Sequence, residues 1–462
     1  MGVLDVLARI GLIIPSAPRP IQRVPLGKRL LFTLLAALVY VALASTPLYG
    51  IQTAGLAVPL SPIVSIVLAM RQGTLAQLGI GPIVTAGLIL QILVGAKLVN
   101  IDLTDPESRK KFTLASKGLA ILLCFIEAAG FVISGVYWYN PAQIPLFIKL
   151  IVLLQLVWGA IIIVMLDEAI QKGWGIGSGI SLFILLGVAQ SFFLDLFSPL
   201  ESASIRMPEH KEIFGIVPYT ISSVMSGTFD VWYVFVHRAI YGYPTFMGLI
   251  ATIIIMVLLV YLTSSRINVP ITSPRLRGIR SRIPLQLLYV TNIPVLLTAI
   301  LISNINVFLS LAERVFGVEV TTLRSFLTPP SLYSFIYRPL ESVVYSAMFI
   351  GLAIAFGLIW IEIAGLNPQA QAENLIRAGL EIPGIRRNPK LLATYLSRYI
   401  YPLTFFSSIL VAVIALIGDI FGTYGTGTGL LLAVGILYNY YQILAYERTL
   451  EMYPALKRLL GE

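Results

Sequence analysis

Three glycine-rich stretches are the most prominent places in this sequence where a chemical site could form. They read GIGPIVTAG (79–87), GIGSGI (175–180) and GTGTGL (425–430). A nucleotide-binding loop also uses closely spaced glycines, but it follows a soluble strand and carries a Lys followed by Ser or Thr. No such Lys follows these stretches, and apolar residues surround each of them. Phosphate binding is therefore not expected.

Few other residues could do chemistry. The chain has one cysteine, Cys124, and two histidines, His210 and His237. One cysteine excludes an intrachain disulfide, and so few soft ligands argue against a zinc or haem site. The apolar segments hold no Asp pair, no Ser–His dyad and no HExxH motif. We therefore expect neither an enzyme nor a cofactor.

Composition assigns the chain to the membrane. Of its 462 residues, 57% are hydrophobic and 12% are charged, whereas soluble domains carry about 25% charged residues. The net charge of +10 comes from basic residues between hydrophobic segments, which indicates topology signals rather than DNA binding. No cleavable signal peptide is expected, because the first 20 residues are short, amphipathic and interrupted by prolines.

Ten segments are long enough to cross a bilayer. They are predicted at 30–70, 72–96, 112–148 with Glu127 inside, about 143–166, 173–194, 239–265, 283–312, 342–361, 399–418 and 420–446. An even number puts both ends on one side, and most Lys and Arg of the connections fall on that side. The sequence thus predicts a multi-pass membrane protein with both termini cytosolic.

Ten spans divide naturally into two inverted halves of five, which would place a pathway between them. No convincing residue-level repeat accompanies this division. The segment 199–238 is long and polar enough for a small hairpin or helix. The predicted units are a cytosolic amphipathic segment (1–27), an N-terminal half (28–198), an external loop (199–243), a C-terminal half (244–448) with cytosolic loops 263–284 and 365–396, and a cytosolic tail (449–462).

The first hydrophobic run is too long for one helix. SPIVSIVLAM (61–70) has Ser61 as an N-cap and Pro62 at the first helical position, and Gly73 ends it. Such a helix is roughly 14 Å long, about half a membrane. It is either an interfacial helix outside the membrane or a short helix that folds back into a funnel.

Each glycine stretch is interleaved with aliphatic residues. Ile80 and Val84, like Ile176 and Ile180, are spaced to share one helix face. Leu431 and Leu432 follow the third stretch. Close packing of small residues between helices is one explanation. A dry, deformable constriction lined by these side chains is the other.

Four motifs in this order resemble the SecY family, the pore-forming (alpha) subunit of the Sec protein translocon, and cover essentially the whole chain. They are GIGPIVTAG, LDEAIQKGWGIGSGISLF, YVTNIPVLL and GTGTGLLL. ITSPRLRG in the loop 263–284 and PALKRLL near the end are similar to the archaeal form. The resemblance implies an all-α membrane protein with an hourglass pore between two five-helix halves.

The resemblance also implies roles for particular residues. A pore ring would comprise Ile80, Val84, Ile176, Ile180, Leu296 and Leu432. A plug at about 58–70 would include Ser61, Pro62, Ile63, Val64, Ile66 and Val67. Spans two and three would part from seven and eight as a lateral gate, beside the polar residues Thr85, Glu127 and Asn292. The docking surface for a ribosome would include Arg275, Arg277, Arg280, Arg282, Arg386 and Arg387.

The implied function is passage of unfolded secretory polypeptides and sideways release of hydrophobic segments into lipid. The implied partners are signal peptides, a ribosome with its nascent chain and rRNA, and small SecE-type and Sec-beta-type single-span subunits. Glu127 and Asn292 could instead only hydrogen-bond between helices. The basic loops could instead serve topology and anionic lipid. Glu362 and Asp419 are interpreted as solvated or capping residues.

A secondary transporter also uses inverted repeats and broken helices. It would need polar or ionisable side chains that converge at the midplane. This sequence places aliphatic residues beside its glycines and has only Glu127 as a clear mid-membrane acid. A channel is therefore favoured.

Overall fold

The computed structural model of this chain is built almost entirely from helices. It describes residues 3–12, 14–22, 24–52, 69–95, 105–138, 140–203, 210–273, 279–290, 292–317, 319–377 and 388–452. In this part of the chain, eight helices are long and apolar enough to cross a membrane, and α4 and α11 add shorter apolar stretches. These ten helices follow the ten predicted segments in order, so the predicted helical membrane architecture is confirmed.

Five of these helices belong to each half of the chain. The first five are α2 (Leu26–Ser45), α4 (Gly81–Gly95), α5 (Pro106–Ile133), α6 (Leu146–Ala169) and α7 (Gly179–Phe197). The second five are α10 (Phe246–Ser264), α11 (Ile293–Phe316), α14 (Pro339–Ile363), α16 (Pro389–Ile420) and α17 (Gly427–Met452).

Local sequence explains where several of these helices begin. Asp105, Ser178, Thr245 and Asn388 each accept a hydrogen bond from a backbone N–H in the first turn of α5, α7, α10 and α16. Such caps satisfy donors that a helix leaves unpaired. Proline opens α5 and α16, where its missing N–H costs nothing.

Shorter elements join the long helices. The helical ones are α1 (Val3–Gly11), η2 (Pro141–Gln143), η3 (Ile170–Trp174), α8 (Ile216–Met225), η4 (Tyr233–His237), α9 (Arg238–Tyr241), α12 (Thr321–Ser325), α13 (Leu332–Tyr337) and α15 (Pro368–Arg377). Two antiparallel hairpins pair β1 (Glu201–Ala203) with β2 (Lys211–Ile213) and β3 (Arg266–Ser273) with β4 (Ile279–Gln286).

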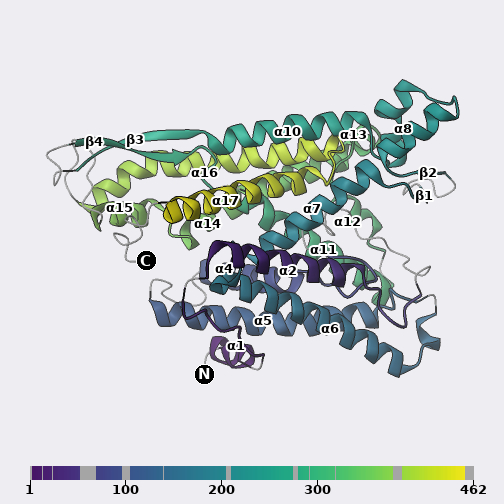
Figure 1. The fold of residues 1–462 in the computed structure, drawn as a ribbon, viewed down its shortest axis with the longest axis horizontal. Helices are drawn as coiled ribbons and strands as arrows, with labels where there is room; N and C mark the ends of the chain where they lie inside the picture. The colour runs from purple at the N-terminus through teal and green to yellow at the C-terminus, as the bar shows by residue number, and fades with distance from the viewer. Residues whose placement is uncertain are drawn as a thin grey trace.

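The two halves lie against each other along the length of the molecule. Figure 1 shows α2, α5 and α6 on one side and α10, α16 and α17 on the other, with α7 beside α17. One end of the molecule carries α15 and the β3–β4 hairpin, and we call it the hairpin end. The opposite end carries α8 and the β1–β2 hairpin, and we call it the cap end.

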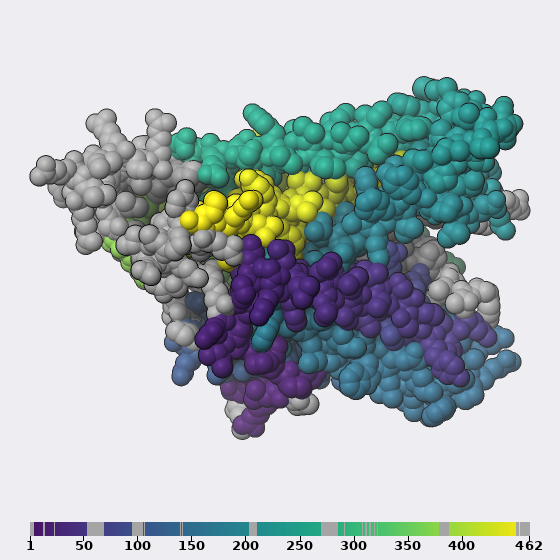
Figure 2. Space-filling view, viewed as in Figure 1, coloured from purple at the N-terminus to yellow at the C-terminus, as the bar shows by residue number. Residues whose placement is uncertain are grey.

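The outer faces of the long helices are apolar and exposed, as lipid contact requires. On α10, Ile254 and Val257 are exposed, whereas Thr252, Ile255 and Leu259 are buried. Figure 2 shows the yellow surface of α17 between the teal surface of α10 and the purple surface of the N-terminal segment. On this face, the fifth helix of the second half thus lies at the boundary between the halves.

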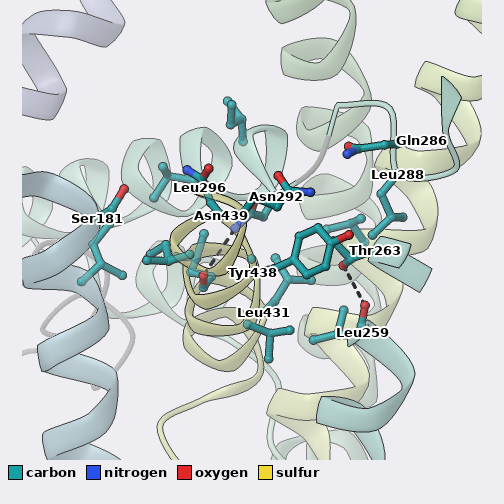
Figure 3. Close-up of a pocket in the computed structure, with 18 of the residues that line it drawn as sticks. Ser181, Leu259, Thr263, Gln286, Leu288, Asn292, Leu296, Leu431, Tyr438 and Asn439 are labelled. Atoms are coloured by element: carbon teal, nitrogen blue, oxygen red, sulfur yellow. Dashed lines mark hydrogen bonds between the residues drawn. The ribbon is translucent and has the colours of Figure 1, made fainter. Parts of the chain in front are cut away.

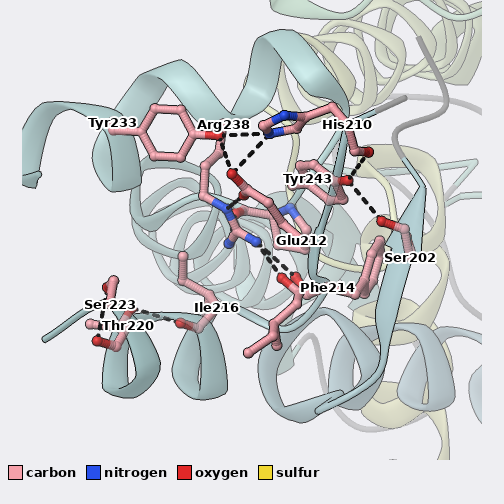
Figure 4. Close-up of polar contacts among 12 residues, drawn as sticks. Ser202, His210, Glu212, Phe214, Ile216, Thr220, Ser223, Tyr233, Arg238 and Tyr243 are labelled. Atoms are coloured by element: carbon pink, nitrogen blue, oxygen red, sulfur yellow. Dashed lines mark hydrogen bonds and ion pairs between the residues drawn. The ribbon is translucent and has the colours of Figure 1, made fainter. Parts of the chain in front are cut away.

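The connection between the halves is fixed by one buried cation at the cap end (Figure 4). Arg238 is fully buried and donates to the carbonyl oxygens of Ile213 (2.6 Å) and Pro244 (3.1 Å) and to Glu212 (3.4 Å). Its guanidinium lies 3.9 Å from the ring centre of Tyr219, a cation–π contact. Burial lowers the pKa of Arg238, and the Glu212 carboxylate opposes that effect. One side chain therefore ties the β1–β2 hairpin, α8 and α9 to the entry of α10.

Candidate pore and lateral gate

The six residues predicted to form a constriction come from four helices of both halves. Val84, Ile180, Leu296 and Leu432 lie on α4, α7, α11 and α17, and Ile80 and Ile176 lie in the turns just before α4 and α7. Ile80, Ile176 and Leu432 are buried. Val84, Ile180 and Leu296 are half-buried and pack against the apolar cluster that contains Ile80 and Leu432. Five of the six residues thus belong to the main apolar core, which extends through most of the long helices, and Ile176 is buried at the turn before α7.

A cavity of about 360 Å³ lies on the hairpin side of this cluster (Figure 3). Ile180, Leu296 and Leu432 form part of its wall. Its polar residues are Ser181, Thr263, Gln286, Asn292, Tyr438, Asn439 and Gln442. None of the described residues that line it is charged. A polypeptide inside would meet hydroxyls and amides but no fixed charge that could trap a segment of opposite sign.

The turn before α7 is held by side chains of α2. The Thr33 hydroxyl accepts a hydrogen bond from Ile176 N at 3.0 Å, and Arg29 Nε donates to Gly175 O at 3.1 Å. Arg29 also forms an ion pair with Glu447 of α17 at 2.6 Å. The backbone that presents Ile176 is therefore tied to both halves of the chain.

The seam between α4 and the pair α11 and α14 is apolar. Leu88, Leu297 and Phe356 form a buried cluster across these three helices. Thr85 on α4 accepts a hydrogen bond from Asn304 Nδ2 on α11 at 2.9 Å. A seam closed by dispersion contacts and one neutral hydrogen bond can open without separating charges.

The three polar residues predicted beside this seam have different partners. Thr85 bonds to Asn304, whereas Asn292 Nδ2 donates to Leu432 O at 3.5 Å, as Figure 3 shows. Glu127 lies on α5 and is half-buried. No hydrogen bond joins Thr85, Glu127 and Asn292 to one another within the described residues, so each is positioned separately.

A second cavity, of about 630 Å³, lies at the cap end. Met70 and Arg71 line it together with Asp195 and Tyr424. Tyr40 of α2 donates a hydrogen bond to Ala69 O at 3.0 Å. The predicted plug residues Ser61, Pro62, Ile63, Val64, Ile66 and Val67 lie outside the described residues.

The arginines predicted as a docking surface fall mostly outside the described part of the chain. Arg275, Arg277, Arg386 and Arg387 lie there. Arg280 and Arg282 belong to β4, which pairs with β3 and extends from the hairpin end. Nearby, burial raises the pKa of Tyr289 to about 12, and its hydroxyl donates to Leu366 O at 2.7 Å. That bond fixes the chain between β4 and α11 against the start of α15.

Sequence reasoning missed several residues that hold these elements. Asn304 lies within the predicted span 283–312. The polar stretch SNIN (303–306) inside that apolar run could have indicated a hydrogen bond between helices. Asp167 and Asp195 were also overlooked, although each is a carboxyl at the edge of a span. Most of the predicted loop 263–284 forms the β3–β4 hairpin instead, and the alternation of Ile267, Val269 and Ile271 with polar residues or Pro is a strand pattern.

Comparison with known proteins identifies this architecture. The family model described as SecY matches residues 74–441, more than half of the chain. The protein translocase subunit SecY of Saccharolobus solfataricus is 46% identical, over 100% of both chains. That of Sulfolobus acidocaldarius is 43% identical, also over 100% of both.

Solved structures agree with the sequence relatives. A structure of a protein-conducting channel superposes with a TM-score of 0.79 at 31% identity, over 98% of this chain and 99% of that one. A SecY structure in which the plug domain stabilises the closed channel and maintains a membrane seal gives 0.78 at 32% identity, over 98% and 99%. Sec61 in the canine ribosome–channel complex from the endoplasmic reticulum gives 0.76 at 30% identity, over 98% and 99%.

These likenesses span the helices, the apolar cluster and the cavity described above. The relatives are translocase subunits and channels, which transport rather than catalyse. The chain belongs to the SecY family of protein translocase subunits, and it is a multi-pass membrane protein that works as a protein-conducting channel.

Proposed function

We propose that Ile80, Val84, Ile176, Ile180, Leu296 and Leu432 form the ring through which unfolded secretory polypeptides pass. The observation that carries this proposal is the uncharged cavity whose wall includes Ile180, Leu296 and Leu432 from three helices of both halves. Short aliphatic side chains exclude water when they meet and yield when a chain separates them. Charged side chains of either sign could then pass without being held.

The seam between α4 and α5 on one side and α11 and α14 on the other is the lateral gate. Its apolar contacts at Leu88, Leu297 and Phe356 resemble the lipid interior. A hydrophobic segment in the pore could therefore replace them and gain about 0.8 kcal/mol for each CH₂ that it buries. Thr85 and Asn304, with Glu127 and Asn292, are the polar groups of this region.

The segment at about 58–70 is the plug that seals the cap side of the ring. Two observations support this role. Residues 69 and 70 are buried next to Tyr40, and Met70 and Arg71 line the 630 Å³ cavity. The SecY structure described above shows that a plug stabilises the closed state in that protein.

The hairpin end faces the cytosol of a cell whose plasma membrane contains this channel. The β3–β4 hairpin and α15 lie at that end in Figure 1, and most basic residues fall in the connections predicted on that side. Arg280 and Arg282, with Arg275, Arg277, Arg386 and Arg387, would meet rRNA phosphates of a bound ribosome. Small SecE-type and Sec-beta-type subunits would complete the complex, and no cofactor is required.

A stalled nascent chain tests the ring directly. Photo-crosslinking probes at residues 80, 176, 180 and 432 should all attach to a translocating chain, whereas a probe at the exposed Leu437 of α17 should not. Leu432→Asn should raise the ion conductance of the closed channel, and Leu437→Asn is the matched control on the same helix. Equal conductance in these two variants would refute the ring assignment.

A further inference from the structure

In the N-terminal half, one aspartate joins the fourth and fifth helices. Asp167 lies near the end of α6 and is buried. Its Oδ1 accepts a hydrogen bond from the backbone N–H of Ile180 at 3.0 Å, and its Oδ2 accepts from Gln171 Nε2 at 2.8 Å. Asp167 therefore caps the first turn of α7 from a neighbouring helix, and it does so at a proposed ring residue.

The C-terminal half repeats this arrangement between its own fourth and fifth helices. Asp419 lies in the last turn of α16. Its Oδ1 accepts from the backbone N–H of Gly427 at 2.7 Å, and its Oδ2 accepts from the Thr428 hydroxyl at 3.5 Å. Leu432 follows Thr428 by four residues and thus lies on the same face of α17.

Glycine at each helix start permits these contacts. A Cβ atom at Gly179 would lie 2.6 Å from Asp167 Cα, and one at Gly427 would collide with Ala415 O of α16. Both collisions involve backbone or Cα atoms that cannot rotate away. The glycines that looked like a nucleotide loop therefore let two helix starts approach two carboxylates.

We call the segment 167–180, between α6 and α7, and the segment 419–428, between α16 and α17, the two joints. The fifth helix of the other half forms a hydrogen bond with each joint. Asp195, near the end of α7, accepts from Gly425 N at 3.1 Å. The Tyr440 hydroxyl on α17 donates to Ser178 O at 3.3 Å. The two joints thus have the same kinds of contact, with the roles of the two halves exchanged. In each, an aspartate of the fourth helix bonds to the start of the fifth, and the fifth helix of the other half adds a further hydrogen bond.

We propose that Asp167 and Asp419 are positioning residues for the ring, a role that rests on the proposed function of Ile176, Ile180 and Leu432. Each carboxylate sets the depth and angle at which its fifth helix enters the centre of the molecule. Asp167 sets the positions of Ile176 and Ile180, and Asp419 sets that of Leu432.

The test measures the two ring positions independently. Cys124→Ala removes the one native thiol, and a cysteine is then placed at residue 180 or 432 of the full channel complex in sealed vesicles. A water-soluble maleimide labels each cysteine slowly in the parent. Asp167→Ala should raise labelling at 180 about tenfold and leave 432 unchanged, and Asp419→Ala should do the reverse, because losing a cap costs roughly a factor of ten in local stability.

Further variants separate positioning from general loss of structure. Asp167→Asn and Asp419→Asn keep an acceptor oxygen and should label like the parent. Asp167→Glu and Asp419→Glu keep the charge but lengthen the side chain, so they should give smaller rises in the same selective pattern in a folded channel. Glu341→Gln is the control, because Glu341 pairs with Arg338 at the start of α14, outside both joints.

Equal rises at both cysteines, or a rise with Glu341→Gln that matches Asp167→Ala, would overturn the proposal. So would Asn variants that label as fast as the Ala variants. Failure of the ring assignment would be seen separately, because nascent chains would then not crosslink to residues 180 and 432 of the parent.

Discussion

The two joints solve the same geometric problem with different chemistry. The joint before α7 is surrounded by long charged or aromatic side chains at the hairpin end. Arg29 bonds to Gly175 and Glu447, Lys172 donates to Ala17 O at 2.7 Å, and Trp174 donates to Pro18 O at 2.7 Å. Many of these groups are partly exposed. This joint should therefore respond to changes of charge.

The joint before α17 is instead closed by packing and by short polar groups. Tyr424 is buried, its N–H donates to the Thr252 hydroxyl at 2.9 Å, and its own hydroxyl donates to Thr245 O at 3.0 Å. Thr252 lies in α10 and Thr245 is the N-cap residue of α10, so both bonds join Tyr424 to that helix. The difference teaches that the same helix-to-helix connection can depend on ion pairs in one half and on tight packing in the other.

The largest expected effect comes from breaking the packed joint. Gly427→Ala should lower the free energy of unfolding by about 3 kcal/mol, because the added methyl group meets α16 backbone. Gly351→Ala on α14 is the control, since nothing lies within 4 Å of its Cβ position, and it should be neutral or stabilising. Thermal unfolding in detergent measures both. A Gly427→Ala protein as stable as the control would contradict the packing argument.

The charged joint should depend on the ion pair between the halves. Side chains of Arg29 and Glu447 are only 16% and 13% exposed, so a double-mutant cycle with Arg29→Gln and Glu447→Gln should give a coupling energy of about 2 kcal/mol. The pair Arg377–Glu373, at 78% and 55% exposure, is the control and should give a few tenths of a kcal/mol. Equal couplings would mean that the first pair is solvated and does not hold the joint.

Some of these features could be predicted from the sequence, and others could not. The ten helices could be predicted because uncharged runs of about 20 residues have few alternatives in a membrane. The ring could be named only through motifs that resemble a known family. The bond between Thr85 and Asn304 joins residues 219 positions apart. Such a contact depends on how helices pack, which local patterns do not encode.

Asp419 shows the same limit at one residue. Its place near a span end predicted a capping or solvated carboxyl, and it does cap α17. That Asp167 does the same in the other half required the structure, because the shared glycine spacing at 175–179 and 425–429 does not show which carboxylate each helix start meets. The repeated capping geometry is therefore visible only in three dimensions.

Alkaline pH should weaken the packed joint. Burial, and then the nearby negative charge of Asp195, raise the pKa of Tyr424. A raised pKa means that the folded protein keeps this proton more tightly than the unfolded chain. Its contribution is complete below about pH 10 and is lost as pH rises toward the folded pKa, at about 1.4 kcal/mol per pH unit. Unfolding measured from pH 9 to 11 should show this loss.

Tyr424→Phe should remove that part of the pH dependence, because the ring remains but the ionisable hydroxyl does not. Tyr441→Phe, which removes an exposed hydroxyl on α17, is the matched control. If both variants follow the same pH profile as the parent, ionisation of Tyr424 does not cause the loss of stability at alkaline pH.

The smallest expected effect concerns the backbone conformation of one residue in the turn before α17. Thr426 has φ of +66° in the turn before α17, a conformation that costs a β-branched residue roughly 1 kcal/mol. Its hydroxyl also accepts from Gly429 N at 3.1 Å. Thr426→Asn should keep a capping oxygen and raise the free energy of unfolding by about 0.5 kcal/mol, because Asn tolerates this conformation better.

The turn before α7 does not offer this gain, because its own residue with positive φ is Gly177, which precedes the N-cap Ser178. Gly177 has φ of +72°, but a Cβ atom there would collide with the ring of Tyr440. Gly177→Asn should therefore destabilise the protein in the same thermal unfolding measurement, whereas Thr426→Asn stabilises it. Opposite signs for these two Asn substitutions would show that the stability of the turn before α17 depends on its backbone conformation. They would also show that the stability of the turn before α7 depends on the side chain of Tyr440 packed against it.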